Sequence, residues 1–148
     1  MVDLEALKQE WVGVEFHRAD FEIMEQQVLD YAEACGDTDP RYSDRSHPDF
    51  QAHPLFVGCL GNTRDSMTPK RFPDLGEIRN IDGGKSVEIH GPIRVGDRLS
   101  GRSQIADIYA KTGRSGTMVF IVHRMDFVNQ HDEKVATVDL RQIKALEG

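Results

Sequence analysis

The chain has 148 residues, a length typical of one domain with a sizeable core. Its formal net charge is −7 and its acidic residues are spread along the sequence, which argues against a nucleic-acid-binding surface. No apolar run is long enough to span a bilayer, and the polar, acidic N-terminus does not resemble a secretory signal. We therefore expect a single cytoplasmic domain over residues 1–148, without a membrane or nucleic-acid partner.

The first helix predicted along the chain runs from Met24 to Cys35. Apolar residues in MEQQVLDYAEAC recur on one helical face, and Gly36 follows at the position where a left-handed residue often ends a helix. Residues 14–23, ahead of this helix, have an extended pattern. Residues 37–49, behind it, are rich in Asp, Pro and Ser, which predicts an ordered loop.

A second helix is predicted from Pro54, because proline is favoured as the first residue of a helix. Its apolar face would include Leu55 and Phe56. Gly58 and Gly61 weaken this helix by about 1 kcal/mol each relative to alanine, but they also allow close packing against a sheet or a ligand.

From residue 76 onward the sequence is rich in Val, Ile, Thr and aromatic residues, and turn residues divide it into strand-like segments. These segments are 76–82, 85–93, 97–110, 117–129 and 134–146. Residues 118–122, MVFIV, are apolar on both faces, which predicts a strand covered on both sides. The predicted fold class is α+β, with a helix packed across a curled antiparallel sheet.

Several residues carry little specific chemistry. Cys35 and Cys59 are too few for a disulfide framework, and each is expected to be reduced and largely buried on an apolar helix face. The six histidines do not approach the spacing of metal ligands, so no metal site is expected, and no cofactor is expected either. The basic pair Lys70 and Arg71 has two interpretations, a solvated surface or a site for a phosphate-bearing ligand.

The stretch CGDTDPRYSD, residues 35–44, places the carboxylate of Asp37 at a helix end, before a turn that proline makes rigid. Such a turn can hold the side chain five residues further on, Tyr42, beside Asp37. A carboxylate and an imidazole around one water would form a general base and a general acid. Amide groups near Leu55 and Phe56 could stabilise a thioester enolate. Without further support, the stretch is also simply a well-formed turn.

YAEACGDTDPRY, residues 31–42, resembles the pattern Y/F-A-x-x-x-G-D-x-N-P-x-H of the MaoC-like hydratase and dehydratase family, in its N-terminal-half type. AHPLF, residues 52–56, and residues 91–122 resemble two further segments of that family. The resemblance implies a hot-dog fold, in which a curled antiparallel sheet wraps a long central helix. It also implies paired chains with acyl-thioester sites at the interface, and it assigns Asp37 to the catalytic aspartate.

This chain departs from the family pattern at Tyr42, which stands where catalytic members have histidine. Tyrosine has a reference pKa near 10, so it is a poor proton shuttle at neutral pH, although it can donate a hydrogen bond. His53 is a second candidate for the missing imidazole, and the alternative is that His53 only caps or packs. The residues that follow it are expected to contact the thioester; they are Pro54, Leu55, Phe56 and Gly58.

The sequence leaves three functions open. The first is a hydro-lyase subunit that hydrates 2-enoyl thioesters or dehydrates 3-hydroxyacyl thioesters, alone or only with a related catalytic chain. The second is a non-catalytic partner that binds the acyl chain, and the third, disfavoured by the G-D-x-D-P turn, is a thioesterase. The expected partners are an acyl-coenzyme A or, less favoured, an acyl carrier protein thioester, and a second hot-dog chain in a homodimer or heterodimer.

Overall fold

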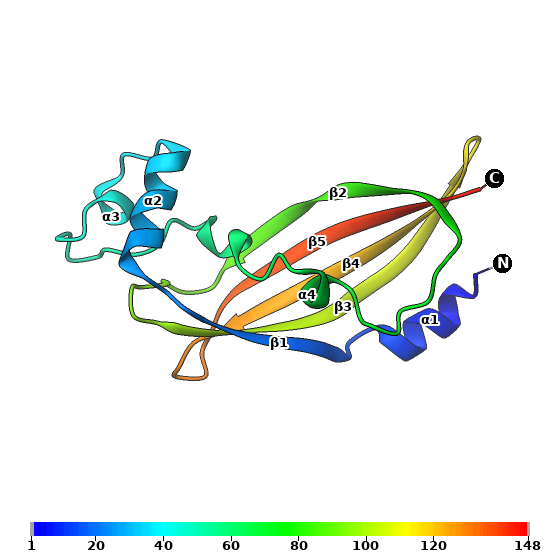
Figure 1. Ribbon diagram of the computed structural model, residues 1–148, viewed down its shortest axis with the longest axis horizontal. Helices are drawn as coiled ribbons and strands as arrows, with labels where there is room; N and C mark the ends of the chain where they lie inside the picture. Colours follow the sequence, from blue (N-terminus) through cyan, green and yellow to red (C-terminus); the bar gives the residue numbers. More distant parts are fainter. Residues whose placement is uncertain (1, 148) are drawn as a thin grey trace.

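The computed structural model describes residues 2–147, which form a long antiparallel sheet with short helices at its ends and over one face (Figure 1). The helical elements are α1 (Leu4–Trp11), α2 (Glu25–Cys35), α3 (Pro40–Ser43), the 3₁₀ turn η1 (Phe56–Cys59) and α4 (Arg64–Met67). The strands are β1 (Glu15–Glu22), β2 (Glu77–Ile89), β3 (Arg98–Gly113), β4 (Gly116–Val128) and β5 (Lys134–Leu146). The five strands lie in the order β1-β3-β4-β5-β2, so the α+β class predicted from the sequence is confirmed.

β2 replaces the two separate strands that we predicted over residues 76–82 and 85–93. The chain does not reverse between them, because Gly83 and Gly84 form a bulge at which the register with β5 shifts between Asp82 and Lys85. Gly84 has a φ of 95°, a conformation that glycine adopts without strain. The glycine pair that resembles a turn in the sequence therefore bends one continuous edge strand.

Two apolar clusters lie on one face of the sheet, which we call the inner face. One cluster lies under α2 and η1 and is built around Phe127, Val57 and Leu99. The other lies under α1 and is built around Ile105, Ile108, Val119 and Ile121. The MVFIV segment is buried at Val119, Ile121 and Val122, whereas Phe120 stacks on Tyr109 with ring centroids 4.8 Å apart.

The long central helix expected from Pro54 does not form. Only Phe56–Cys59 is helical there, as a single 3₁₀ turn, and Gly61 follows with a left-handed φ of 68°. The carbonyl oxygen of Gly58, which a continuing helix would use internally, accepts a hydrogen bond from Lys85 Nζ at 2.8 Å. The longest helix in residues 2–147 is α2, with 11 residues, and Figure 1 shows it at one end of the sheet.

Candidate functional site

Asp37 follows α2 directly because the helix ends where the sequence predicts. Gly36 adopts the left-handed conformation, with φ 68° and ψ 20°, and its N–H bonds back to the last turn. Asp39 then caps the short helix α3, since its side chain accepts a hydrogen bond from the Arg41 amide at 3.0 Å. This turn carries Tyr42 inward, where it is 9% exposed.

The structure brings Asp37 and His53 into contact. His53 Nε2 lies 3.1 Å from Asp37 Oδ2, and the Asp39 amide donates to Asp37 Oδ1 at 2.9 Å. The Leu55 amide donates to His53 Nδ1 at 3.1 Å, so Nδ1 acts as an acceptor, and Nε2 is the nitrogen that faces the Asp37 carboxylate. One nitrogen of the imidazole is therefore engaged by the chain's own backbone, and the other lies against Asp37.

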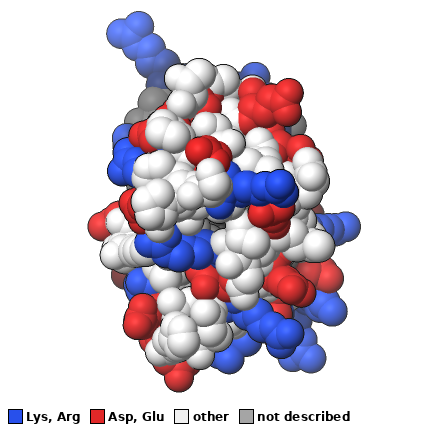
Figure 2. Space-filling model, turned by 90° about the vertical axis from the view of Figure 1, so that its left-hand side faces the viewer, with Lys and Arg blue, Asp and Glu red and all other residues white. Residues whose placement is uncertain are grey.

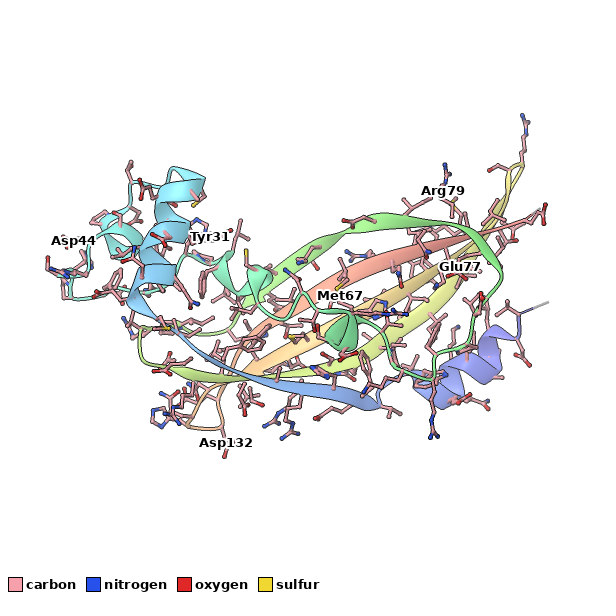
Figure 3. The ribbon with its side chains drawn as sticks, viewed as in Figure 1. Tyr31, Asp44, Met67, Glu77, Arg79 and Asp132 are labelled. Carbon is pink, nitrogen blue, oxygen red and sulfur yellow. The ribbon has the colours of Figure 1, made fainter. Side chains whose placement is uncertain are left out.

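Two aromatic rings pack against His53, and a third packs behind one of them. The Tyr42 ring meets the His53 ring edge-on with centroids 5.1 Å apart, and the Tyr31 ring lies 5.6 Å from His53. Phe56 meets Tyr31 edge-on at 5.8 Å. Figure 3 shows Tyr31 on the side of α2 that faces the rest of the chain. The three predicted catalytic residues, Asp37, Tyr42 and His53, are thus adjacent, with 15% of the His53 side chain and 32% of the Asp37 side chain exposed.

Tyr31 is a site residue that our sequence reasoning treated only as part of the apolar face of a helix. Burial, and then the nearby thiols of Cys59 and Cys35, raise the pKa of Tyr31 above its usual value. The signal that could have identified it is its place at the aromatic first position of the motif. Its protonated hydroxyl and its ring contacts with His53 add a third aromatic neighbour to the site.

The predicted substrate-binding residues divide between surface and core. Leu55 is 53% exposed beside His53 and Pro54 is half-buried, whereas Phe56 and Gly58 lie in the core. The backbone amides expected to stabilise an enolate are engaged within the chain, because the Phe56 amide donates to the His53 carbonyl at 2.9 Å and the Gly58 amide to the Leu55 carbonyl at 3.1 Å. These two amides therefore already have hydrogen-bond acceptors within the chain.

Both cysteines are exposed, so the expectation that they are buried is wrong. Cys35 is the last residue of α2 and Cys59 the last residue of η1, and neither helix continues far enough to bury its final side chain. They are free thiols, as expected.

Arginines and carboxylates alternate over this end of the molecule, which Figure 2 faces. Arg41 pairs with Asp39 and Arg94 with Asp49, each at 2.8 Å. Hydrogen bonds from these guanidinium groups hold the pKa of Asp39 and of Asp49 below the usual value. The charged rim of the candidate site is therefore largely neutralised within the chain.

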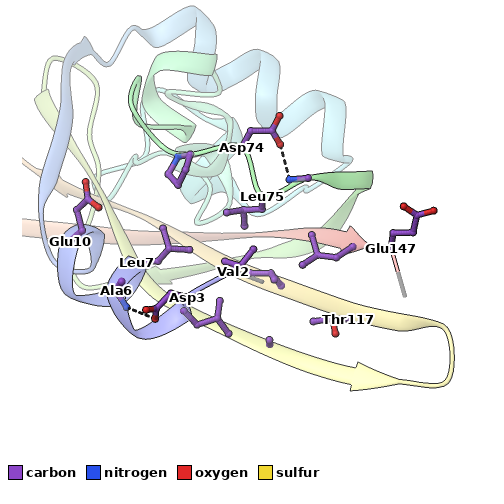
Figure 4. Close-up of a pocket in the computed structure, with 15 residues that line it drawn as sticks. Val2, Asp3, Ala6, Leu7, Glu10, Asp74, Leu75, Thr117 and Glu147 are labelled. Atoms are coloured by element: carbon purple, nitrogen blue, oxygen red, sulfur yellow. Dashed lines mark hydrogen bonds between the residues drawn. The ribbon is translucent and has the colours of Figure 1, made fainter.

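None of the five principal cavities in residues 2–147 is lined by Asp37, Tyr42 or His53. The largest, about 800 Å³, lies at the opposite end of the sheet, between α1 and the segment before β2 (Figure 4). Its lining is apolar with four carboxylates and no Lys, Arg or His; the carboxylates are Asp3, Glu10, Asp74 and Glu147. Such a lining does not suit a phosphate-bearing thioester carrier.

Within residues 2–147, no group of three or more His, Cys, Asp or Glu side chains is placed to hold a metal ion. No helix there is long and apolar enough to cross a membrane.

The antiparallel sheet, with Asp37 placed directly after α2, defines a hot-dog domain of the MaoC-like hydratase and dehydratase class. The chain belongs to the family described as FAS1-like, dehydratase domain region, whose model matches residues 10–138. The resemblance read from the sequence is therefore confirmed. Among curated proteins, the chain is similar to UPF0336 protein SCO4636 of Streptomyces coelicolor, with 32% identity over 117 residues, covering 73% of this chain and 77% of that protein.

Two solved complexes from Mycobacterium tuberculosis have the same fold. The ChsH1–ChsH2 complex matches with a TM-score of 0.74 and 22% identity, covering 97% of this chain and 91% of that chain. The C-terminally truncated HadBC complex, a (3R)-hydroxyacyl-ACP dehydratase, matches with a TM-score of 0.62 and 20% identity, covering 84% of this chain and 90% of that chain.

Proposed function

We propose that this chain is one subunit of an acyl-thioester hydratase or dehydratase that becomes active when a related hot-dog chain pairs with it. The observation that carries the proposal is the contact of the Asp37 carboxylate with His53, whose Nδ1 is already engaged by the Leu55 amide. Adding water to a 2-enoyl thioester requires a base for the water and an acid for the neighbouring carbon. Asp37 can act on the water, whereas the second proton-transfer group must come from elsewhere.

The surroundings of Asp37 support a partner chain. Asp37 and His53 lie at a surface that none of the principal cavities reaches. A second chain that covers this surface would supply the other wall of a substrate tunnel. β2 is an edge strand, paired only with β5, and its Ile78 and Ile89 are 69% and 38% exposed. Two of the structural relatives, ChsH1–ChsH2 and HadBC, are complexes of two chains. We propose a related hot-dog chain as the partner, coenzyme A as the acyl carrier, and the cytoplasm as the location.

A second candidate function is a non-catalytic subunit that binds the acyl chain while its partner performs the chemistry. Tyr42 at the histidine position favours this role, as does the hydrogen bond that the Leu55 amide donates to His53 Nδ1. In this case the Asp37–His53 contact would only stabilise the loop after α2.

Reconstitution distinguishes the two candidates. The chain, a related hot-dog chain that carries the intact G-D-x-N-P-x-H motif, and the two together are assayed for hydration of crotonyl-coenzyme A. Activity that requires both chains, and that is lost with Asp37→Asn in this one, supports the first candidate. Activity that survives Asp37→Asn in a stable complex supports the second. Release of free thiol without hydration would contradict both and would indicate a thioesterase.

Tyr42→His tests whether the rest of the site is competent. The substitution restores the imidazole of the family motif at a buried position beside His53. If the site is otherwise intact, the isolated chain should gain hydratase activity over the wild-type chain, and Tyr42→Phe should not. Failure of folded Tyr42→His protein to gain activity, alone or with the partner, would favour the non-catalytic role.

A further inference from the structure

A second cavity, of about 430 Å³, lies where α1 passes into β1. One wall comes from Trp11, Phe16 and His17, and the other from the segment after α4, including Lys70 and Arg71. Trp11 at the end of α1 meets Phe72 at 5.6 Å, which fixes that segment beside the α1–β1 junction (Figure 1). The proposed chemistry at Asp37 does not use this cavity.

The lining of this cavity includes two cationic side chains, whereas the charged side chains of the large cavity beyond α1 are all carboxylates. Lys70 and Arg71 are exposed, and neither forms an ion pair with a carboxylate anywhere in residues 2–147. Asp65 is the single carboxylate among the residues that line the cavity. Two unpaired cations and one carboxylate leave the site ready to accept an anion. A guanidinium group and an ammonium group that lie side by side, as in Arg71 and Lys70, are common ligands of phosphate.

The opposite wall offers aromatic faces. Trp11 and Phe16 are half-buried, so part of each ring is accessible from the cavity. Indole and phenyl rings stack on nucleobases with little regard to base identity. Aromatic faces on one side and a Lys–Arg pair on the other fit a ligand with a planar base at one end and phosphates at the other.

We propose that this cavity binds the base and phosphates of a phosphorylated nucleoside, with the base against Trp11 and Phe16 and the phosphates at Lys70 and Arg71. The source can be the nucleotide end of coenzyme A or a free nucleotide. The first source rests on the proposed function, because it would make coenzyme A, and not acyl carrier protein, the acyl carrier.

Trp11 is the only tryptophan in the chain, so its fluorescence reports directly on this wall. The full-length chain is titrated with coenzyme A, 3′-phospho-ADP, ADP and inorganic phosphate, exciting tryptophan at wavelengths where adenine does not absorb. We expect saturable quenching by the nucleotides and weaker binding of phosphate alone, by roughly tenfold, because phosphate lacks a stacking base. Tighter binding of 3′-phospho-ADP than of ADP identifies coenzyme A as the source, and equal binding identifies a free nucleotide.

Charge reversal provides the matched control. Lys70→Glu/Arg71→Glu should weaken nucleotide binding at least about tenfold, since it places carboxylates at the phosphate position. Arg79→Glu/Arg114→Glu makes the same change in net charge at two exposed arginines away from the cavity, and it should leave the affinity unchanged. Trp11→Phe, followed by calorimetry, should weaken binding less than the charge reversal does.

Two results would overturn the inference. One is the absence of saturable quenching at millimolar nucleotide, and the other is an equal loss of affinity in both charge-reversed proteins. The test uses ligands without an acyl group, so it is independent of hydratase activity. An inactive complex that still binds 3′-phospho-ADP contradicts only the proposed function, and an active complex whose chain binds no nucleotide contradicts only this inference.

Discussion

At the α2 end of the sheet, Asp37, His53 and Tyr42 lie in contact, yet none of the principal cavities reaches them. At the α1 end, a cavity of about 800 Å³ is open, yet its polar lining is limited to carboxylates and neutral groups. One end therefore has groups that can transfer protons and little enclosed space, and the other has space and no acid–base pair.

The difference between the two ends explains why this chain should depend on another. A hydratase must exclude bulk water from the reacting carbons, and an open carboxylate cannot do so. A partner chain that covers the α2 end would enclose Asp37 without any change at the α1 end. The two ends can therefore be tested separately by substitution.

The largest effect on the hydration rate is expected when a carboxylate at the α2 end is removed, and a carboxylate at the α1 end provides the comparison. Asp37→Asn should lower hydration by the reconstituted complex by about 10² to 10⁴-fold, as expected for the loss of an acid–base group. Asp74→Asn removes a carboxylate at the rim of the large cavity but keeps an acceptor for the Gly76 amide, so activity should stay within about twofold. Initial rates with crotonyl-coenzyme A measure both effects. An equal loss of rate in the two variants would contradict the assignment of the chemistry to the α2 end.

A somewhat smaller effect is expected at His53, which we regard as a positioning residue. His53→Ala removes the imidazole whose Nε2 lies 3.1 Å from Asp37 Oδ2 and should lower kcat by roughly 10²-fold, with little change in KM, since misplacement of a reacting group has that order of cost. His53→Gln retains an N–H donor and should recover most of the rate. If Gln fails to recover while binding and folding are intact, His53 transfers the proton itself.

The middle of the sheet, between the two ends, should respond to pH through His123. Burial is the main cause that lowers the pKa of His123 to about 4; the nearby charge of Lys144 contributes to this shift, and the Gln142 side chain opposes it. Because the unfolded chain takes up this proton near pH 6.5 and the folded chain does not, stability falls as pH drops from about 6.5 to about 4, by about 3 kcal/mol.

Urea unfolding at several pH values measures this loss. His123→Gln should flatten the dependence between pH 6.5 and 4, whereas the same change at His131, which is exposed, should not. An unaltered slope in His123→Gln would show that this histidine is not buried as a neutral ring.

The smallest expected effect concerns the thiols at the α2 end. Cys35 and Cys59 are exposed, so a thiol reagent should label both in the native protein at rates close to those of the unfolded chain. Cys35→Ser and Cys59→Ser should each remove one labelled site without a change in stability. Labelling that requires unfolding would mean that a partner or a second copy covers this end.

Local patterns allowed part of this site to be predicted from the sequence. Gly36 ends α2 and Asp39 caps α3 through contacts within a few residues, so the placement of Asp37 could be read directly. The proximity of His53 was only a hypothesis, because its contact with Asp37 depends on how the whole loop returns from α3 to η1. The residues next to His53 in the sequence do not determine the path of this loop.

The error over the central helix has a similar origin. Pro54 favours a helix start, but Lys85, on a distant strand, donates a hydrogen bond to the Gly58 carbonyl, and a Cβ atom at Gly58 would lie only 3.3 Å from Val87 Cγ2. Both contacts join residues that are far apart in the sequence, so they cannot be predicted from the residues next to Gly58. The exposure of Cys59 follows from the same error, because Cys59 was placed on a helix face that does not exist.

The strand order also has a consequence for the time course of folding. β3, β4 and β5 follow one another through short turns, whereas β1 must find β3, and β2 must find β5, across long intervening stretches of chain. The segment with Asp37 and His53 lies between β1 and β2, the two strands whose pairing closes the longest loops. On the ribosome, β2 cannot pair until β5 has emerged, so we expect this segment to settle only when synthesis of the chain is nearly complete.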